Sequence, residues 1–261
     1  MTNLVERVDA DGIATLTINR PDKLNALTVG AIVGYLVTFV VVAPLLWILL
    51  LSFESNQQIL SHPWSIAHLS TANYRNAIHT LDLMRMYKNT FILASVSGSV
   101  GLAISFMLAV ALTRMVFKHP RLQTALRYFF LAGLAVPVYI LLFPVYKLDI
   151  TFHIFGTYLA LILPYIAVAI PFNTLLLTGF LADFPEELEQ AAVVDGCGLY
   201  QMCRYIIAPL MRPVFATLAI FNVIYIWNEF PFAVTLINKP SLTTISLGVS
   251  QFQGVWNVDY G

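Results

Sequence analysis

The chain has 261 residues, of which 59% are hydrophobic and 11% are charged, whereas a typical soluble domain has about 45 to 50% and about 25%. This composition excludes an ordinary soluble domain and indicates an integral membrane protein. The 14 basic residues equal the 14 acidic residues, so no charge surplus points to nucleic acid or to an acidic tail.

The first 28 residues differ from the rest of the chain. They contain no apolar run of the kind that a signal peptide needs, so we do not expect a cleaved export signal. A turn at Asp11-Gly12, followed by alternating apolar and polar residues, predicts a two-stranded hairpin. With the elements Asn19-Arg20-Pro21 and Asn25-Ala26-Leu27, residues 4–27 resemble the beginning of enoyl-CoA hydratase and isomerase (crotonase) enzymes.

This resemblance covers only the hairpin. The oxyanion-hole loops and acid residues of crotonases lie further along their chains and have no counterpart here, so we assign no acyl-CoA chemistry. We interpret residues 1–28 as a crotonase-like fragment that is foreign to the rest, joined near Thr28 through a fusion, a misread start or an artificial chimera.

Five stretches are apolar and long enough to span a bilayer as helices, which takes roughly 20 residues. The second is rich in Ser, Gly and Ala, which lets another helix approach closely. The third contains Pro137 and Pro144, and the fourth contains Pro164 and Pro171, so we expect both to be kinked. The five predicted spans are residues 29–51, 90–113, 128–146, 155–181 and 214–237.

The basic residues beside these spans predict their orientation. With the N-terminus in the cytoplasm, nine Lys and Arg residues lie inside and five lie outside. Residues 53–87 then form an outside loop, residues 182–213 an inside segment, and residues 238–261 an outside segment too polar to be a sixth span.

The inside segment has the pattern of two short helices. Asp183 can cap the first, acidic residues suit its first turn, and Gly196 can end it in a left-handed conformation. Leu188, Ala191 and Ala192 give it a narrow apolar side, as docking into a groove of another protein requires. A second helix is expected over residues 199–207, before Pro209.

This segment resembles the cytoplasmic loop of permeases in binding-protein-dependent ABC importers. Gln190 and Cys197 depart from the commonest residues of that loop. Similarity to the carbohydrate branch comes from Pro171-Phe172 and from residues 184–187, 209–213 and 227–230, with a looser match at Asn73-Tyr74 and Asn89-Thr90, and it extends over residues 29–261. The residues that match or belong to the loop are Glu186, Glu187, Glu189, Ala191, Ala192, Asp195, Gly196 and Pro209.

The resemblance implies an all-α, polytopic helical bundle of the MetI-like type in a bacterial cell membrane. It implies a second permease subunit, two ATP-binding subunits seated on the cytoplasmic loops, an extracytoplasmic solute-binding protein and surrounding lipid as partners. Permeases of this type usually have six spans, so we expect the chain to be a truncated permease that lacks the sixth. The solute is expected to be a carbohydrate, with a polyol, a glycerol phosphate or another small solute as alternatives.

Glu229 is the only acid well inside an apolar run, where a carboxylate needs a cavity or a partner. Together with Trp227 and Asn228 it is expected to line the translocation path, as is Asn173 in the fourth span. The alternative for all four is that they hold helices together through polar contacts.

The chain has no phosphate-binding loop of the G-x-x-x-x-G-K-[ST] type, and its five histidines are scattered. We therefore expect no metal, no cofactor and no enzymatic activity, with ATP bound by another subunit. Three alternatives stay open: an acyl-CoA hydratase or isomerase, supported by residues 4–27 alone; a channel or secondary transporter that needs no ATPase; and a non-functional fragment.

Overall fold

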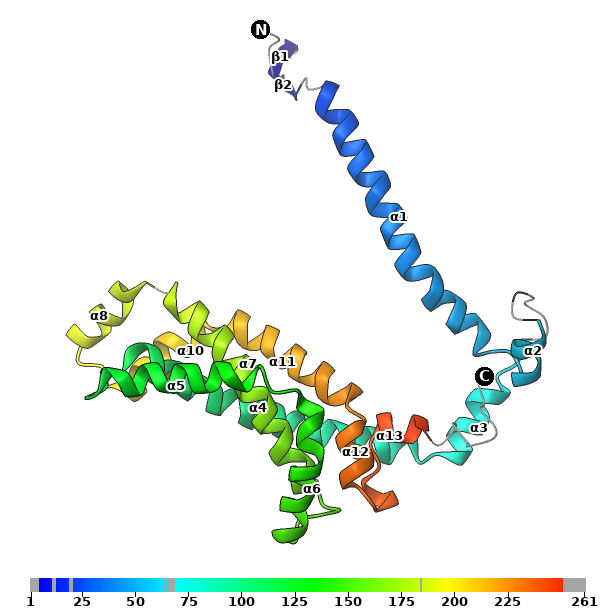
Figure 1. Ribbon diagram of the computed structural model, residues 1–261. Helices are drawn as coiled ribbons and strands as arrows, with labels where there is room; N and C mark the ends of the chain where they lie inside the picture. The colour runs from blue at the N-terminus through cyan, green and yellow to red at the C-terminus, as the bar shows by residue number, and fades with distance from the viewer. Residues whose placement is uncertain are drawn as a thin grey trace. The chain divides into compact units, whose positions relative to one another are not determined.

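The computed structural model in Figure 1 describes residues 5–10, 13–18, 21–62, 64, 69–183 and 185–250. The chain divides into two compact units. The first contains residues 1–77 and 259–261, and the second contains residues 78–258.

The first unit begins with the predicted hairpin. Strand β1 (Val5–Ala10) pairs antiparallel with β2 (Ile13–Ile18), in a register that places Val5 opposite Ile18 and Ala10 opposite Ile13. The hairpin prediction is therefore confirmed, although its turn residues lie outside the described part of the chain. Helix α1 (Pro21–Leu51) follows and extends the first predicted span towards the N-terminus.

The end of α1 is tied to two short helices, α2 (Asn56–Ser61) and α3 (Ala72–Thr80). Asn73 donates hydrogen bonds from Nδ2 to the carbonyl oxygens of Ser52 (3.0 Å) and Glu54 (2.7 Å). The Ser52 hydroxyl lies 2.6 Å from that of Tyr74. These contacts close the loop after α1, whereas no residue in the most apolar window of α1 is buried within the structure.

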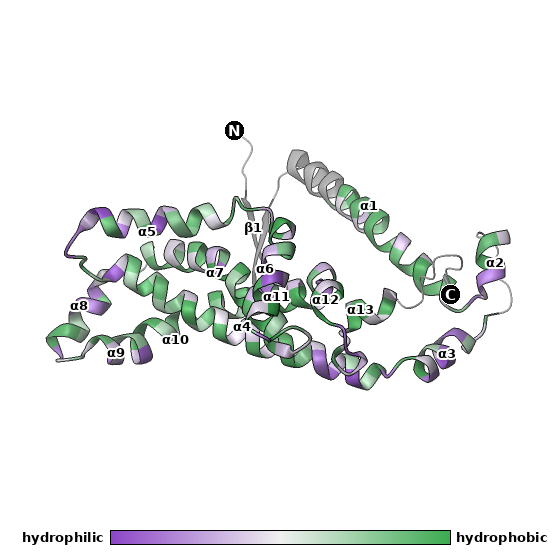
Figure 2. Ribbon diagram, turned by 60° about the horizontal axis from the view of Figure 1, so that its bottom comes forward, coloured by the Kyte–Doolittle hydropathy of each residue, from purple (hydrophilic) through white to green (hydrophobic). Residues whose placement is uncertain are grey.

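The second unit is a bundle around α4 (Leu83–Arg114), which packs along α7 (Tyr158–Ala182) and α11 (Arg212–Asn228). The small residues of α4 allow this approach, as the sequence predicts. Gly101 is buried against α7, where an added Cβ would lie 3.6 Å from the Cβ of Ala169. Figure 2 shows that apolar residues predominate along these helices, while hydrophilic residues gather in α3 and at the beginning of α8.

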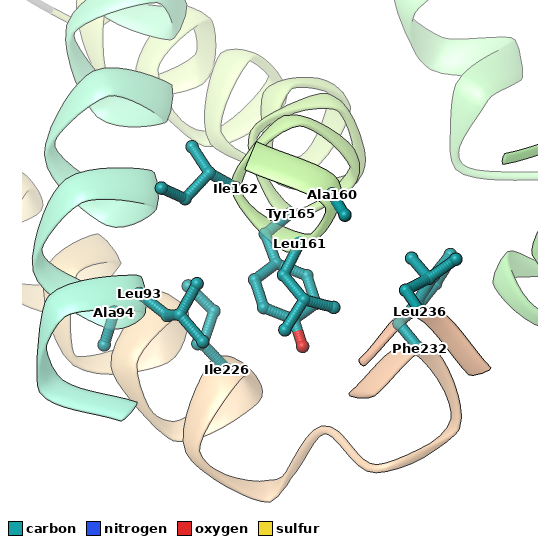
Figure 3. Close-up of a cluster of buried hydrophobic side chains, with 9 residues drawn as sticks. All are labelled: Leu93, Ala94, Ala160, Leu161, Ile162, Tyr165, Ile226, Phe232 and Leu236. Atoms are coloured by element: carbon teal, nitrogen blue, oxygen red, sulfur yellow. The ribbon is translucent and has the colours of Figure 1, made fainter. Parts of the chain in front are cut away.

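Two apolar clusters hold the bundle together. Figure 3 shows the first, with Tyr165 at its centre. Its buried members are Leu93, Ala94, Ala160, Leu161, Ile162, Tyr165, Ile226, Phe232 and Leu236. The second cluster joins the other ends of α4 and α7 to the segment before α11 and to α11 itself, through Ala109, Val110, Leu177, Leu181, Met202, Ile207, Met211 and Leu218.

The third predicted span is not one kinked helix. It is divided into α5 (Pro120–Gly133), a short 3-10 helix η1 (Val138–Leu141) and α6 (Leu142–Thr151), and the two halves meet at 94°. Pro137 has an extended backbone and lacks an N–H, and it disfavours helical geometry in the residue before it. The expected kink is therefore a complete break.

The fifth predicted span, residues 214–237, is wrong as a single helix. Helix α11 ends at Asn228 and α12 (Pro231–Leu236) begins after a break at Glu229 and Phe230. Pro231 removes a backbone donor that a continuous helix would need. The chain then continues through a 3-10 helix, η3 (Pro240–Leu242), to α13 (Ile245–Val249).

The number of candidate membrane spans in the part of the chain that the structure describes, three to five, is consistent with the sequence prediction of five. Among the described residues, three helices are long and apolar enough to cross a bilayer alone, and two bent pairs raise the number to as many as five. The second pair joins residues 199–210 to α11 with a bend of 73°. Many large side chains on the bundle are exposed, including Phe91 (67%) and Phe143 (74%), as suits a surface that meets lipid or other subunits.

Candidate coupling segment and translocation path

Helix α8 (Glu186–Val194) is the first short helix predicted in the inside segment. Its N-cap is Pro185, with an extended backbone (φ −61°, ψ 117°), and Asp183 instead caps the C-terminal end of α7. The predicted capping role of Asp183 is therefore wrong, because the extended proline separates Asp183 from the first turn of α8. Glu186 begins the helix, and its side chain lies outside the described residues.

The end of α8 follows the sequence prediction. Gly196 is left-handed, with φ of 80°. Its N–H donates to the carbonyl of Val193 (3.0 Å), and the N–H of Cys197 donates to the carbonyl of Ala192 (2.9 Å). This pair of bonds is a Schellman motif, which satisfies helix-end carbonyls and favours glycine at the left-handed position.

One side of α8 is fixed to the bundle by a buried ion pair. Glu189 is 9% exposed, and its Oε1 lies 2.7 Å from Nε of Arg114, the last residue of α4. Nη2 of Arg114 also donates to the carbonyl of Leu181 at the end of α7 (2.7 Å). Glu189 and Arg114 thus join the ends of α8, α4 and α7.

The other side of α8 is exposed and partly apolar. Leu188 is 47% exposed and Val194 is 87% exposed, and Ala191 lies exposed between them, whereas Ala192 is buried. The apolar side predicted from Leu188, Ala191 and Ala192 is therefore divided between an inner and an outer face. The carboxylates of Glu187 and Asp195 belong to exposed residues beside the outer face.

A second short helix follows, as predicted, but it contains a wider turn. Residues Leu199–Met202 form α9, Cys203–Ile207 form a π-helical turn, and Ala208–Leu210 form α10. The N–H of Ala208 donates to the carbonyl of Cys203, five residues back. Pro209 is half-buried in α10, at the approach to the bend before α11.

Glu229 lies in the break between α11 and α12 and is 4% exposed. Its Oε1 accepts from the N–H of Phe232 (2.7 Å), and its Oε2 accepts from the hydroxyl of Tyr165 (2.6 Å) and the N–H of Ala233 (3.2 Å). Its backbone carbonyl accepts from the hydroxyl of Ser246 (2.6 Å). These are the contacts expected of a residue that holds helices together, and a role in the translocation path stays a prediction.

The other three predicted path residues have different surroundings. The ring of Trp227 packs on Tyr87, with centroids 5.7 Å apart. Asn228 is exposed and donates from Nδ2 to the carbonyl of Ile224 (2.8 Å). Asn173 is fully buried in α7, and its amide has no hydrogen-bond partner among the described residues. Trp227, Asn228 and Glu229 thus contact different neighbours.

A cavity of about 520 Å³ lies between α5, η1, α7 and α11. Its polar and aromatic lining comes from Phe172, Phe221, Asn222 and Tyr225. Sequence reasoning missed this site, because the broken backbone between α5 and α6 forms one of its walls. Elsewhere in the described ranges, no three His, Cys, Asp or Glu side chains gather where they could hold a metal ion.

Comparison with known proteins decides the family. The model of the family described as "Binding-protein-dependent transport system inner membrane component" matches residues 101–261. The chain belongs to this family. As a permease of this kind, it is a membrane transport subunit and not an enzyme, which favours the transport interpretation over an acyl-CoA hydratase and over a channel or secondary transporter.

Individual relatives support the same assignment. The permease is 34% identical over 223 residues to a putative ABC transporter permease protein, ORF2, of Caldicellulosiruptor sp., covering 85% of this chain and 80% of the relative. It is 32% identical to the diacetylchitobiose uptake system permease NgcG of Streptomyces coelicolor (85% and 74% covered). It is 29% identical to the trehalose/maltose transport system permease MalG of Thermococcus litoralis (89% and 82% covered).

A solved structure shares the fold of the permease. A chain of a bacterial ABC transporter involved in the import of the acidic polysaccharide alginate superposes with a TM-score of 0.75, at 17% identity, covering 94% of this chain and 85% of that one. The predicted MetI-like helical bundle is therefore confirmed. The resemblance of residues 4–27 to crotonases, and the domain boundary near Thr28, stay predictions.

The permease also contains a polar network that its sequence did not reveal. Asn89 in α4 donates from Nδ2 to the carbonyls of Ser241 (3.0 Å) and Thr243 (2.9 Å), and its Oδ1 accepts from the hydroxyl of Tyr158 (2.6 Å). The neighbouring hydroxyl of Thr90 accepts from the N–H of Ile245 (3.0 Å). The Asn89-Thr90 pair, noted in the sequence only as a family similarity, thus fixes the segment after α12 to α4.

Proposed function

We propose that this permease forms part of the translocation path for a carbohydrate in an ATP-driven importer. Its partners are a second permease, two ATP-binding subunits and an extracytoplasmic solute-binding protein, and its N-terminus faces the cytoplasm. Relatives named for the uptake of diacetylchitobiose and of trehalose and maltose support the choice of a carbohydrate.

The two faces of α8 are the observation that carries the proposal. The inner face is held by Glu189, and the outer face presents Leu188, Ala191 and Val194. These residues are spaced three apart, which places them on one side of a helix and suits docking into an apolar groove. We infer that the groove that receives this face of α8 lies on an ATP-binding subunit.

The ion pair connects α8 to the membrane helices. When an ATP-binding subunit displaces α8, the side chain of Glu189 pulls or pushes on Arg114, which holds the ends of both α4 and α7. Because this pair is nearly buried, it resists separation better than an exposed pair. Movement of the ATP-binding subunits is thereby coupled to the bundle.

The position of α8 agrees with the predicted orientation. The end of α4 that carries Arg114 is followed by Lys118, Arg121 and Arg127, and cytoplasmic loops are enriched in such residues. The N-terminus then faces the cytoplasm, because one further span, α1, precedes α4.

Co-purification in detergent tests the coupling proposal. The permease is expressed with its second permease and ATP-binding subunits, with Val194→Glu as the test variant and Val116→Glu as the matched control, since Val116 is 98% exposed at the same end but outside α8. We expect Val194→Glu to lose the ATP-binding subunits and Val116→Glu to retain them. If both variants retain the complex, α8 is not the helix on which the ATP-binding subunit docks. Glu189 is unsuitable for this test because its substitution also breaks an internal ion pair.

A further inference from the structure

We propose that the cavity between α5, α7 and α11 is a subsite for a neutral saccharide during transport. Asn222 would hydrogen-bond to a sugar hydroxyl, and Phe172, Phe221 and Tyr225 would contact the apolar faces of the sugar ring. The subsite deepens the proposed function and rests on it. None of the four residues predicted from the sequence to line the path contributes to this cavity.

Asn222 is the polar centre of the subsite. It is 6% exposed on α11, and its Nδ2 has no hydrogen-bond partner among the described residues. Leaving a buried donor unpaired is costly, and each such group in a folded protein calls for an explanation. Asn222 lines the cavity, and because Nδ2 itself is buried, its amide would turn towards the cavity so that a hydroxyl of a bound sugar supplies the missing acceptor.

The backbone around Asn222 keeps its side chain in place. Gly98 of α4 lies behind it, so close that an added Cβ there would be 3.8 Å from the Cβ of Asn222. Helices α4 and α11 therefore pack directly against each other at this level of the bundle. The base of the Asn222 side chain is fixed, and only its amide end can respond to a ligand.

Aromatic rings supply the apolar part of the site. Phe172 of α7 and Phe221 of α11 meet edge to face, with centroids 5.9 Å apart. These rings and that of Tyr225 are each 37–50% exposed. Rings of this kind give a large rigid contact area, and tyrosine adds a polar hydroxyl. A few polar groups set in a mainly apolar wall are typical of small-molecule sites, which commonly measure about 300–1,000 Å³.

The lining also indicates the charge of the saccharide. No Asp, Glu, Lys or Arg is among the described residues that line the cavity. An anionic sugar would lose its hydration without gaining a countercharge from this chain, whereas a neutral sugar needs only hydrogen bonds and apolar contact. The subsite should therefore discriminate against sugar acids.

The walls of the cavity are suited to a path through a membrane. The residues between Gly133 and Leu141, where α5 and α6 are separated by the 94° break, form one wall, and Pro171 of α7 forms part of another. Non-helical backbone at membrane depth is tolerated where protein or a water-filled cavity satisfies its polar groups. An aqueous path for a sugar meets this requirement.

Thiol protection in the complete importer tests the subsite. The two native cysteines are replaced (Cys197→Ser and Cys203→Ser), and Asn222→Cys is compared with Ile224→Cys, which lies on the same helix, is 53% exposed and does not line the cavity. Proteoliposomes carrying the importer are first assayed for ATP-dependent uptake of maltose, trehalose and diacetylchitobiose. If none of the three is transported, the proposed carbohydrate function fails, and the subsite fails with it.

With a transported sugar in hand, we expect that sugar to slow maleimide modification of Asn222→Cys at least about fivefold and to leave Ile224→Cys unchanged. Glucuronate at the same concentration should protect neither. Equal modification of Asn222→Cys with and without a sugar that is still transported would overturn the subsite and leave the proposed function standing. Protection by glucuronate would overturn the assignment to neutral sugars.

Uptake kinetics supply an independent measurement. Asn222→Ala should raise the KM for the transported sugar about threefold to tenfold, which is the loss of one hydrogen bond, while the importer still co-purifies and its binding-protein-stimulated ATPase activity is retained. An unchanged KM would contradict the proposal. Asn222→Trp should block uptake without separating the two permeases, and loss of the second permease from the complex would show that a partner helix fills the cavity, which would also overturn it.

Discussion

The two ends of α4 are held in different ways. At the Arg114 end, α8 is joined to the bundle by one ion pair and leaves an apolar face exposed. At the Leu83 end, Asn89 and Thr90 bind the backbone of the C-terminal segment, and Glu229 binds the backbone of α12. At the Arg114 end, an exposed helix face is therefore free to contact another protein. At the Leu83 end, hydrogen bonds within the chain hold the broken helices in place.

Because of this difference, we expect some substitutions to lower the stability of the permease and others to uncouple ATP hydrolysis from sugar uptake. Loss of backbone-binding groups at the Leu83 end should lower stability, because buried N–H and C=O groups lose their partners. Loss of the ion pair at the Arg114 end should affect transport more than folding.

The largest expected effect is on stability, from Glu229→Ala. This substitution leaves the N–H groups of Phe232 and Ala233 and the hydroxyl of Tyr165 without their acceptor. We expect a loss of at least about 3 kcal/mol, since each unsatisfied buried group costs about 1–3 kcal/mol. Thermal unfolding in detergent measures it, with the exposed Asn228→Ala as control, and an equal Tm for both variants would contradict the account of this end.

The next effect is expected for Glu189→Ala and Arg114→Ala, because each removes one partner of a nearly buried ion pair. Such a loss costs up to about 3–5 kcal/mol in a fully buried pair, and less here because the side chains are 12–13% exposed. We expect ATPase activity that no longer drives uptake, measured as sugar transported per ATP hydrolysed.

The exchanged pair, Arg114→Glu with Glu189→Arg, sharpens this test. It should recover part of the coupling, although the carbonyl of Leu181 loses the bond that Nη2 of Arg114 donates. If the exchanged pair is no better than either single variant, the ion pair is not the connection between α8 and the bundle.

A smaller loss of stability is expected for Asn89→Ala. This substitution removes two hydrogen bonds to backbone carbonyls and one from the hydroxyl of Tyr158. These three bonds are neutral, and each contributes about 0.5–1.5 kcal/mol, so we expect about 1.5–4.5 kcal/mol in total. Proteolysis of the C-terminal segment under native conditions should become faster. A protease pattern identical to that of the unchanged permease would show that other contacts hold this segment.

The smallest effect is expected for Gly196→Ala. The left-handed backbone at this position costs a residue with a Cβ about 1–2 kcal/mol, although nothing lies within 4 Å of the added atom. The bundle should keep its Tm while α8 frays. Weaker retention of the ATP-binding subunits, with Gly179→Ala as an open-space glycine control in α7, measures the change.

The sequence predicted much of this arrangement because its signals are local. Apolar length located the spans, alternation located the hairpin, and Gly196 located the end of α8. The failures involve residues far apart in the chain. The motif predicts Glu189 as a coupling residue but not its ion pair with Arg114, 75 positions away, and it does not predict the hydrogen bond between Glu229 and Tyr165, 64 positions apart.

Breaks in helices were the second source of failure. Proline at 137 predicts a kinked helix, whereas Pro231 falls inside a span predicted as continuous, and whether a helix bends or stops at a proline depends on which groups replace the missing backbone bonds. At Glu229 the carboxylate supplies those bonds, and this became visible only when α12 and α7 were placed together. The cavity beside Asn222 depends on the other break and was hidden for the same reason.

Sugar uptake by the reconstituted importer tests the central claim most directly. Proteoliposomes contain the second permease and the ATP-binding subunits with either the unchanged permease or Val194→Glu, and uptake is measured with and without ATP and the solute-binding protein. We predict uptake that requires both and is lost in Val194→Glu. Uptake that persists without ATP, or that is equal with the variant, would contradict an ATP-driven permease coupled through α8.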